Sequence, residues 1–216
     1  MESPQIFSEL FFSTLFDGRK RIIPVLEVAK VADAVPLAQA LAAGGVSVIE
    51  ITLRTDAALA AIAAVRKQCP EVVVGVGSVR KPAEMRSAVA AGAQFAVSPG
   101  CTEQLAHTAL AINFPYLPGA MTPSEMLVLL ELGFGYLKFF PAQTAGGMAM
   151  LKSVGGPIPQ LKFCPTGGID EASYKAFLQL KNVFCVGGSW MVPRDAIENN
   201  DWQRVTALAT AIQTNV

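Results

Sequence analysis

Short runs of β-branched and aromatic residues alternate with longer stretches rich in Ala and Leu, and this alternation restricts the possible fold more than any other feature. The apolar runs predict strands within residues 21–28, 46–53, 71–78, 93–100, 114–121, 134–142, 160–168 and 182–189. Helical periodicity predicts helices over 33–43, 55–68, 81–91, 102–111, 122–132, 147–154, 171–179 and 195–213. Strands that alternate with helices in this way form a parallel sheet with crossover helices.

The predicted strands are too apolar to have a face in water, which favours a closed (β/α)8 TIM barrel, an α/β fold. An open doubly wound sheet is the alternative, because short apolar strands do not reveal closure. An extra amphipathic helix is predicted over residues 5–16, and the side chains that would cover one end of the barrel are Ile6, Phe7, Leu10, Phe11 and Leu15. No linker interrupts the series, so we expect one domain over residues 1–216.

Charge and hydrophobicity limit the classes of partner. Seventeen Lys and Arg residues balance seventeen Asp and Glu residues. Without a summed positive field, we expect neither nucleic acid nor an anionic membrane as a partner. Hydrophobic residues make up 52% of the chain and charged residues 16%. A chain of this composition is expected to have more apolar surface than a monomer of its size usually exposes. We therefore expect a homo-oligomer.

The amino-terminal segment does not have the pattern of an export signal. Glu2 stands where a signal peptide carries positive charge, and Glu9 interrupts the apolar stretch. No apolar run approaches the roughly 18 residues needed to cross a bilayer. A cytoplasmic protein is therefore expected.

Cysteine and histidine usage argues against a metal centre. The four cysteines are widely separated and are expected to be buried thiols: Cys69, Cys101, Cys164 and Cys185. His107 is the one histidine of the sequence, and its surroundings indicate a helix flank. Zinc enzymes and Ser-His-Asp hydrolases need histidine at one or several particular positions, and only His107 is available. Catalysis must then come from Lys, Glu, Arg or backbone groups.

Polar residues at the carboxyl ends of the predicted strands are the candidates for chemistry, because barrels build their active sites there. Glu50 lies within an apolar strand, and Arg54 follows it with the same parity, so both are expected to face the barrel mouth. A structural Glu-Arg pair at a strand end is the alternative. Lys138 lies among Phe134, Tyr136 and Phe139, and poor solvation of its ammonium would favour the nucleophilic free amine. A lysine that only packs its stem is the alternative there.

Glycine pairs end the seventh and eighth predicted strands. Gly167 and Gly168 follow Thr166, and Gly187 and Gly188 precede Ser189. Paired glycines let the backbone approach a ligand, and helix starts after them would direct N–H groups at an anion. This is where barrels bind phosphate. Two tight turns without a ligand are the alternative.

These segments resemble one known family. Glu50 with LRT, then GVGS, AVSPG, YLPG, KFFPA around Lys138, CPTGGI and VGGSW occur in the order and spacing of the 2-keto-3-deoxy-6-phosphogluconate (KDPG) aldolase family. The resemblance extends from about Ile22 to Asp201. It implies a class I aldolase, usually a trimer, that cleaves a phosphorylated keto-deoxy sugar acid of the Entner–Doudoroff route into pyruvate and glyceraldehyde 3-phosphate, with no cofactor or metal. Cleavage of 4-hydroxy-2-oxoglutarate (KHG) is an expected side activity.

The resemblance also implies roles for individual residues. Lys138 is similar to the Schiff-base lysine, Glu50 to the proton-transferring carboxylate and Arg54 to the partner of the substrate carboxylate. Thr166 resembles the residue near the substrate hydroxyls. The remaining positions resemble the phosphate cradle (Gly167, Gly168, Gly188, Ser189) and the pocket wall (Pro99, Phe140). Ser78 stands where better-known members have Thr.

Three other functions are consistent with parts of this pattern. An aldolase for the galacto epimer would share the lysine, although Thr166 favours the gluco form by resemblance. A phosphosugar isomerase or epimerase on the same barrel would not need Lys138. A noncatalytic sugar-phosphate-binding module would keep its ligand after Lys138 is removed.

Overall fold

The computed structural model describes residues 4–212, and its strands are short, apolar and mostly buried. They are β1 (Ile22–Leu26), β2 (Val48–Thr52), β3 (Val73–Gly77), β4 (Ala96–Val97), β5 (Tyr116–Leu117), β6 (Gly119–Ala120), β7 (Tyr136–Phe139), β8 (Lys162–Pro165) and β9 (Val186–Gly188). Each lies within a segment predicted to be a strand. The fifth predicted strand is divided into β5 and β6 at Pro118, whose nitrogen has no hydrogen to donate.

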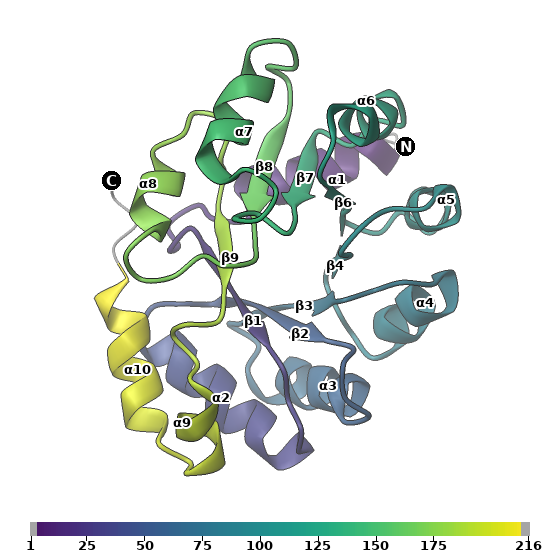
Figure 1. Cartoon of the computed structure of the whole chain (residues 1–216). Helices are drawn as coiled ribbons and strands as arrows, with labels where there is room; N and C mark the ends of the chain where they lie inside the picture. The colour runs from purple at the N-terminus through teal and green to yellow at the C-terminus, as the bar shows by residue number, and fades with distance from the viewer. Residues whose placement is uncertain (1–3, 213–216) are drawn as a thin grey trace.

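The strands pair in parallel in two ladders. One ladder has the order β5-β4-β3-β2-β1-β9, and the other has the order β6-β7-β8. Two isolated parallel bridges, Phe163 with Val183 and Thr166 with Gly187, connect β8 to the segment of β9. Figure 1 shows the sheet curling, with helices around its outside. The parallel α/β class is thus confirmed, whereas closure into a complete eightfold barrel remains a prediction.

The helices are α1 (Pro4–Thr14), α2 (Val31–Ala43), α3 (Ala58–Gln68), α4 (Pro82–Ala90), α5 (Glu103–Ala111), α6 (Pro123–Glu131), α7 (Gly147–Gly155), α8 (Tyr174–Leu178), α9 (Arg194–Glu198) and α10 (Trp202–Ala211). Side-chain caps fix several of their starts. The Thr102 hydroxyl accepts from the N–H of Leu105, and Thr122 and Glu125 form a reciprocal capping box.

The single helix predicted over 195–213 is wrong. Asn200 has a φ of 54°, a left-handed conformation that stops α9, and the Asp201 carboxylate accepts from the N–H of Arg204 to start α10. Residue 213 lies outside the described part of the chain. The helix predicted over 171–179 is also shorter, because a turn through Asp170 and Ser173 precedes α8.

Two buried clusters form the core. The larger lies between strands and outer helices, and the smaller joins strand side chains such as Ile23, Val48 and Leu117 to Phe12 and Leu15 near α1. The helix predicted at the amino terminus therefore does pack on strand side chains, although Leu10, one of its predicted contacts, is 52% exposed. Burial of the apolar strand faces leaves the few buried polar groups conspicuous.

Candidate active site

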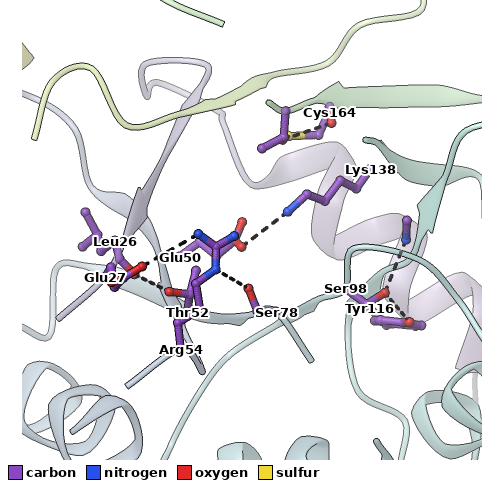
Figure 2. A network of polar contacts seen from close by, with 12 residues as sticks. Leu26, Glu27, Glu50, Thr52, Arg54, Ser78, Ser98, Tyr116, Lys138 and Cys164 are labelled. Atoms are coloured by element: carbon purple, nitrogen blue, oxygen red, sulfur yellow. Dashed lines mark hydrogen bonds and ion pairs between the residues drawn. The ribbon is translucent and has the colours of Figure 1, made fainter. Parts of the chain in front are cut away.

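Lys138 and Glu50 meet in the interior of the curled parallel sheets. Lys138 is on β7 and Glu50 on β2, and both side chains are buried, with exposures of 4% and 2%. Lys138 Nζ lies 3.5 Å from Glu50 Oε1 and 5.2 Å from the centroid of the Phe140 ring. Figure 2 shows the two side chains pointing toward one another from different strands. Removing two ionisable groups from water costs free energy, and such buried pairs occur mainly at functional sites.

The Glu50 carboxylate is incompletely satisfied. Glu50 Oε1 is buried and has no hydrogen-bond partner in the described structure. This oxygen is paired with the Lys138 ammonium group's nitrogen but accepts no hydrogen bond, so it retains the capacity to accept one from a bound molecule. The carboxylate lies directly over Gly77 of β3, where a Cβ would be 2.5 Å from Glu50 Cγ. Only glycine at 77 leaves this space.

Arg54 lies just beyond the end of β2 and is exposed. Its Nε donates to the Ser78 hydroxyl at 3.2 Å, and its guanidinium lies 3.9 Å from the Glu27 carboxylate. Ser78 has a φ of 57°, which directs its hydroxyl toward Arg54 after the end of β3. Arg54 and Ser189 both line a cavity of about 690 Å³ at the ends of β1 and β9. Glu27 was not among the residues predicted from the sequence, where no local pattern indicates it as a partner of Arg54.

Thr166 and the glycine pairs extend the site across β8 and β9. Thr166 is buried, and a Cβ on Gly187 would come within 3.1 Å of its Cγ2. Gly167 has a φ of 100° and lies against the Phe140 ring, where an added Cβ would be 3.3 Å from ring atoms. The Phe140 ring thus contacts both Lys138 and Gly167. Gly168 has a φ of 78°, Gly188 packs against Trp190, and Ser189 is exposed.

The helix predicted from residue 171 starts three residues later, whereas α9 starts one residue before the predicted 195. α8 begins at Tyr174 and α9 at Arg194, so turns follow both glycine pairs, and both helices are only five residues long. Any anion at these positions would meet loop backbone and the Ser189 hydroxyl.

Pro99 lies at the end of β4 and is exposed. Its backbone packs on Gly119, which pairs with Lys138 in the register of β6 and β7. Glu50 lies midway along β2, while the other predicted site residues lie at or just beyond the carboxyl ends of their strands. Glu50 and Phe140 contact Lys138 directly.

Two nearby thiols are not part of the predicted site. Cys164 pairs with Lys138 in the register of β7 and β8. Burial, followed by the neighbouring Cys164 thiol, raises the pKa of Cys185 well above its ordinary value. Cys69 is also buried, but Cys101 is half-buried, which corrects the expectation that all the thiols are buried.

We searched the described residues for groups that could bind a metal ion and for helices that could span a membrane. No group of three His, Cys, Asp or Glu within residues 4–212 could hold a metal ion. His107 is an exposed residue of α5 and lies 3.5 Å from Glu103. In the same range, none of the helices is both long and apolar enough to span a membrane.

Comparisons with known proteins agree with this geometry. The family model for KDPG and KHG aldolases matches residues 17–208. The KHG/KDPG aldolase of Escherichia coli K12 is 48% identical over 188 residues, which are 87% of this chain and 88% of the relative. A solved structure of KDPG aldolase from Legionella pneumophila, with pyruvate captured as a covalent carbinolamine, has a TM-score of 0.89 and 42% identity and covers 98% of both chains. The KDPG aldolase of Zymomonas mobilis with 3-phosphoglycerate has a TM-score of 0.88 and 40% identity, covering 94% of this chain and 97% of that one.

Proposed function

The chain belongs to the KDPG and KHG aldolase family and is a class I aldolase that cleaves KDPG, and we propose that Lys138 is its Schiff-base amine and Glu50 its proton-transfer group. The observation that carries these assignments is the buried ion pair of Lys138 Nζ and Glu50 Oε1, 3.5 Å apart, in which that oxygen accepts no hydrogen bond in the described structure. A nucleophile beside a proton carrier is what imine chemistry requires.

The reaction begins with addition of the neutral Lys138 amine to the C2 ketone of the sugar acid. The amine supplies the electron pair for the new C–N bond, and a proton passes from the nitrogen to the carbonyl oxygen, which becomes a hydroxyl. Glu50 then donates a proton to this hydroxyl, which leaves as water and gives an iminium. The proton has a short distance to travel, because the hydroxyl is on the carbon bonded to Lys138 Nζ, and Nζ is already in contact with the Glu50 carboxylate.

Cleavage uses the iminium as an electron sink. Glu50 takes the proton of the C4 hydroxyl, the C4–O bond becomes a carbonyl, and the C3–C4 bonding pair moves into the enamine. Glyceraldehyde 3-phosphate leaves. Return of the proton to C3 gives the pyruvyl iminium, and addition of water releases pyruvate and restores the Lys138 amine. Because only the pyruvyl half is bonded to the enzyme, KHG follows the same steps and gives pyruvate and glyoxylate.

The other candidate residues orient the substrate. Arg54 binds the C1 carboxylate with Ser78 beside it, and Thr166 contacts a substrate hydroxyl. The resemblance of Thr166 to the family residue favours the gluco over the galacto epimer. Pro99 and Phe140 form the walls around the reacting carbon. The backbone at Gly167, Gly168 and Gly188, with the Ser189 hydroxyl, holds the phosphate. Remote phosphate binding places C2 over the amine.

The remaining proposals concern the closure of the barrel, the number of domains, the oligomeric state and the cellular location. The division of one strand at Pro118 and the bridges between β8 and the β9 segment support closure of the two ladders into a (β/α)8 barrel with α1 across one end. We propose that this barrel is a single domain, that three copies form a homotrimer and that the enzyme works in the cytoplasm. No cofactor enters the proposed steps.

Borohydride trapping tests the lysine assignment. The enzyme is incubated with pyruvate and sodium borohydride, digested and mapped by mass spectrometry. We expect a reduced pyruvyl adduct on Lys138, and loss of both the adduct and KDPG cleavage in Lys138→Met. Lys162→Met is the matched control, because Lys162 is on the neighbouring strand β8 and its Nζ donates to the carbonyl of Lys181 instead. Label on another residue, or ordinary turnover by Lys138→Met, would refute the assignment.

A further inference from the structure

A wall of closely packed backbone connects the Pro99 loop to the lysine. An added Cβ at Gly119 would lie 2.6 Å from the nitrogen of Gly100 and closer still to the Pro99 carbonyl. Gly119 is also the register partner of Lys138, and the Lys138 N–H donates to the Pro118 carbonyl at 2.9 Å. The loop that forms one side of the pocket therefore rests directly on the segment that positions the lysine backbone.

A chain of buried hydrogen bonds holds this wall in place. The Gly119 N–H donates to Ser98 Oγ at 3.3 Å, and Ser98 Oγ lies 2.6 Å from the Tyr116 phenol oxygen. The phenol donates to Cys101 Sγ at 3.5 Å, so the Ser98 hydroxyl is left to donate to the phenol. Ser98 and Tyr116 are both fully buried, and Figure 2 shows their hydroxyl groups meeting.

These bonds occur where regular strand pairing is interrupted. β5 and β6 are separated by Pro118, and β4 ends immediately before Ser98. The Ser98 hydroxyl supplies the acceptor for the N–H of Gly119 at this break. Burial raises the pKa of Tyr116 well above its ordinary value, which keeps the phenol protonated and able to donate.

We infer that Ser98 and Tyr116 are positioning residues for the aldol reaction, because their hydroxyl groups fix the spacing between the Pro99 loop and the Lys138 strand. Neither hydroxyl is assigned any contact with the reacting atoms. The inference rests on the proposed function, since it takes Lys138 as the covalent amine.

The test measures imine formation and turnover in Tyr116→Phe, Ser98→Ala and the double variant. One net hydrogen bond corresponds to roughly a fivefold effect on rate. We expect Tyr116→Phe to lower the borohydride trapping rate at saturating pyruvate and kcat for KDPG about fivefold, with KM changed less than twofold. We expect Ser98→Ala to lower both rates about tenfold and the double variant to be no worse than Ser98→Ala, since coupled residues are not additive.

Tyr136→Phe is the matched control. Tyr136 is on the same strand as Lys138 but belongs to the cluster that packs on α1. We expect it to trap pyruvate at the wild-type rate, whatever its thermal midpoint. A wild-type trapping rate and kcat in Tyr116→Phe would overturn the inference while labelling of Lys138 in the wild type upholds the proposed function. An unlabelled Lys138 in the wild type would overturn both.

Discussion

Gly77→Ala tests whether the position of the Glu50 carboxylate matters for catalysis. In the structure, a Cβ on residue 77 would lie 2.5 Å from Glu50 Cγ and 2.6 Å from Cδ, whereas ordinary contact begins at 3.4 Å. The carboxyl carbon must then move by about 0.8 Å or more. A displacement of about 1 Å in an active site can cost about 100-fold in rate. We therefore expect kcat for KDPG to fall about 100-fold.

The same substitution should leave the fold intact. Gly77 does not have a positive φ, and the clashing atoms all belong to the Glu50 side chain rather than to the backbone. We expect unfolding in urea, followed by circular dichroism, to give a midpoint close to that of the wild type. Gly100→Ala is the matched control, because an added Cβ there meets nothing within 4 Å.

Steady-state turnover and pyruvate trapping together report on the mechanism. Gly77→Ala should still label Lys138, more slowly, because the lysine remains and only its proton carrier has moved. If Gly77→Ala turned over KDPG within about twofold of the wild type while Glu50→Gln did not, the carboxylate would act from a different position, and the reasoning from contact with Gly77 would be refuted.

Three further predictions follow from individual contacts. Glu50→Gln should retain the Lys138 adduct but lose about 100-fold or more in KDPG turnover, as expected for loss of a general acid–base group; unchanged turnover would make Glu50 structural. Ser78→Thr should destabilise the fold by about 1 kcal/mol in urea unfolding, because a β-branched residue is strained at the φ of 57°; equal stability would contradict this. For Glu125, burial raises the pKa, but hydrogen bonds from Met121 and Thr122 outweigh it, and the net pKa is below the ordinary 4.5. The ionised group therefore stabilises the fold above that pH, and the benefit is lost as pH falls through the lowered pKa. Glu125→Gln should cost about 0.5 kcal/mol at pH 7 because the carboxylate is exposed, and the difference from the wild type should shrink in acid unfolding.

The sequence was sufficient to predict the strands and the central pair. β-branched runs locate β1, β2 and β3 because a buried strand needs side chains that pack on both faces. Glu50 and Lys138 stand out because charged residues rarely occur inside such runs. Their meeting across the sheet was less secure, because it depends on the strand register, which a single sequence does not contain.

Features that depend on three-dimensional contacts were missed or predicted wrongly. Nothing local distinguishes Glu27, an exposed residue after β1, as a partner of Arg54. The break between α9 and α10 depends on Asn200 adopting a left-handed conformation, in a stretch whose apolar periodicity continues. The Ser98 and Tyr116 bond joins residues that are 18 positions apart.

The role predicted for glycine from the sequence differs from the role that several glycines have in the structure. In the sequence, paired glycines indicated turns and close approach to phosphate. Gly77, Gly119 and Gly187 instead lie in or beside strands without positive φ, and each lies under a polar group or loop of the site: the Glu50 carboxylate, the Pro99 backbone and Thr166. The missing Cβ atoms create the room in which Glu50 and Thr166 fit between neighbouring strands. For this reason a methyl group added at Gly77 or Gly187 should disturb the chemistry more than the fold, whereas one added at Gly119 would meet the backbone of Pro99 and Gly100 and should disturb the fold as well.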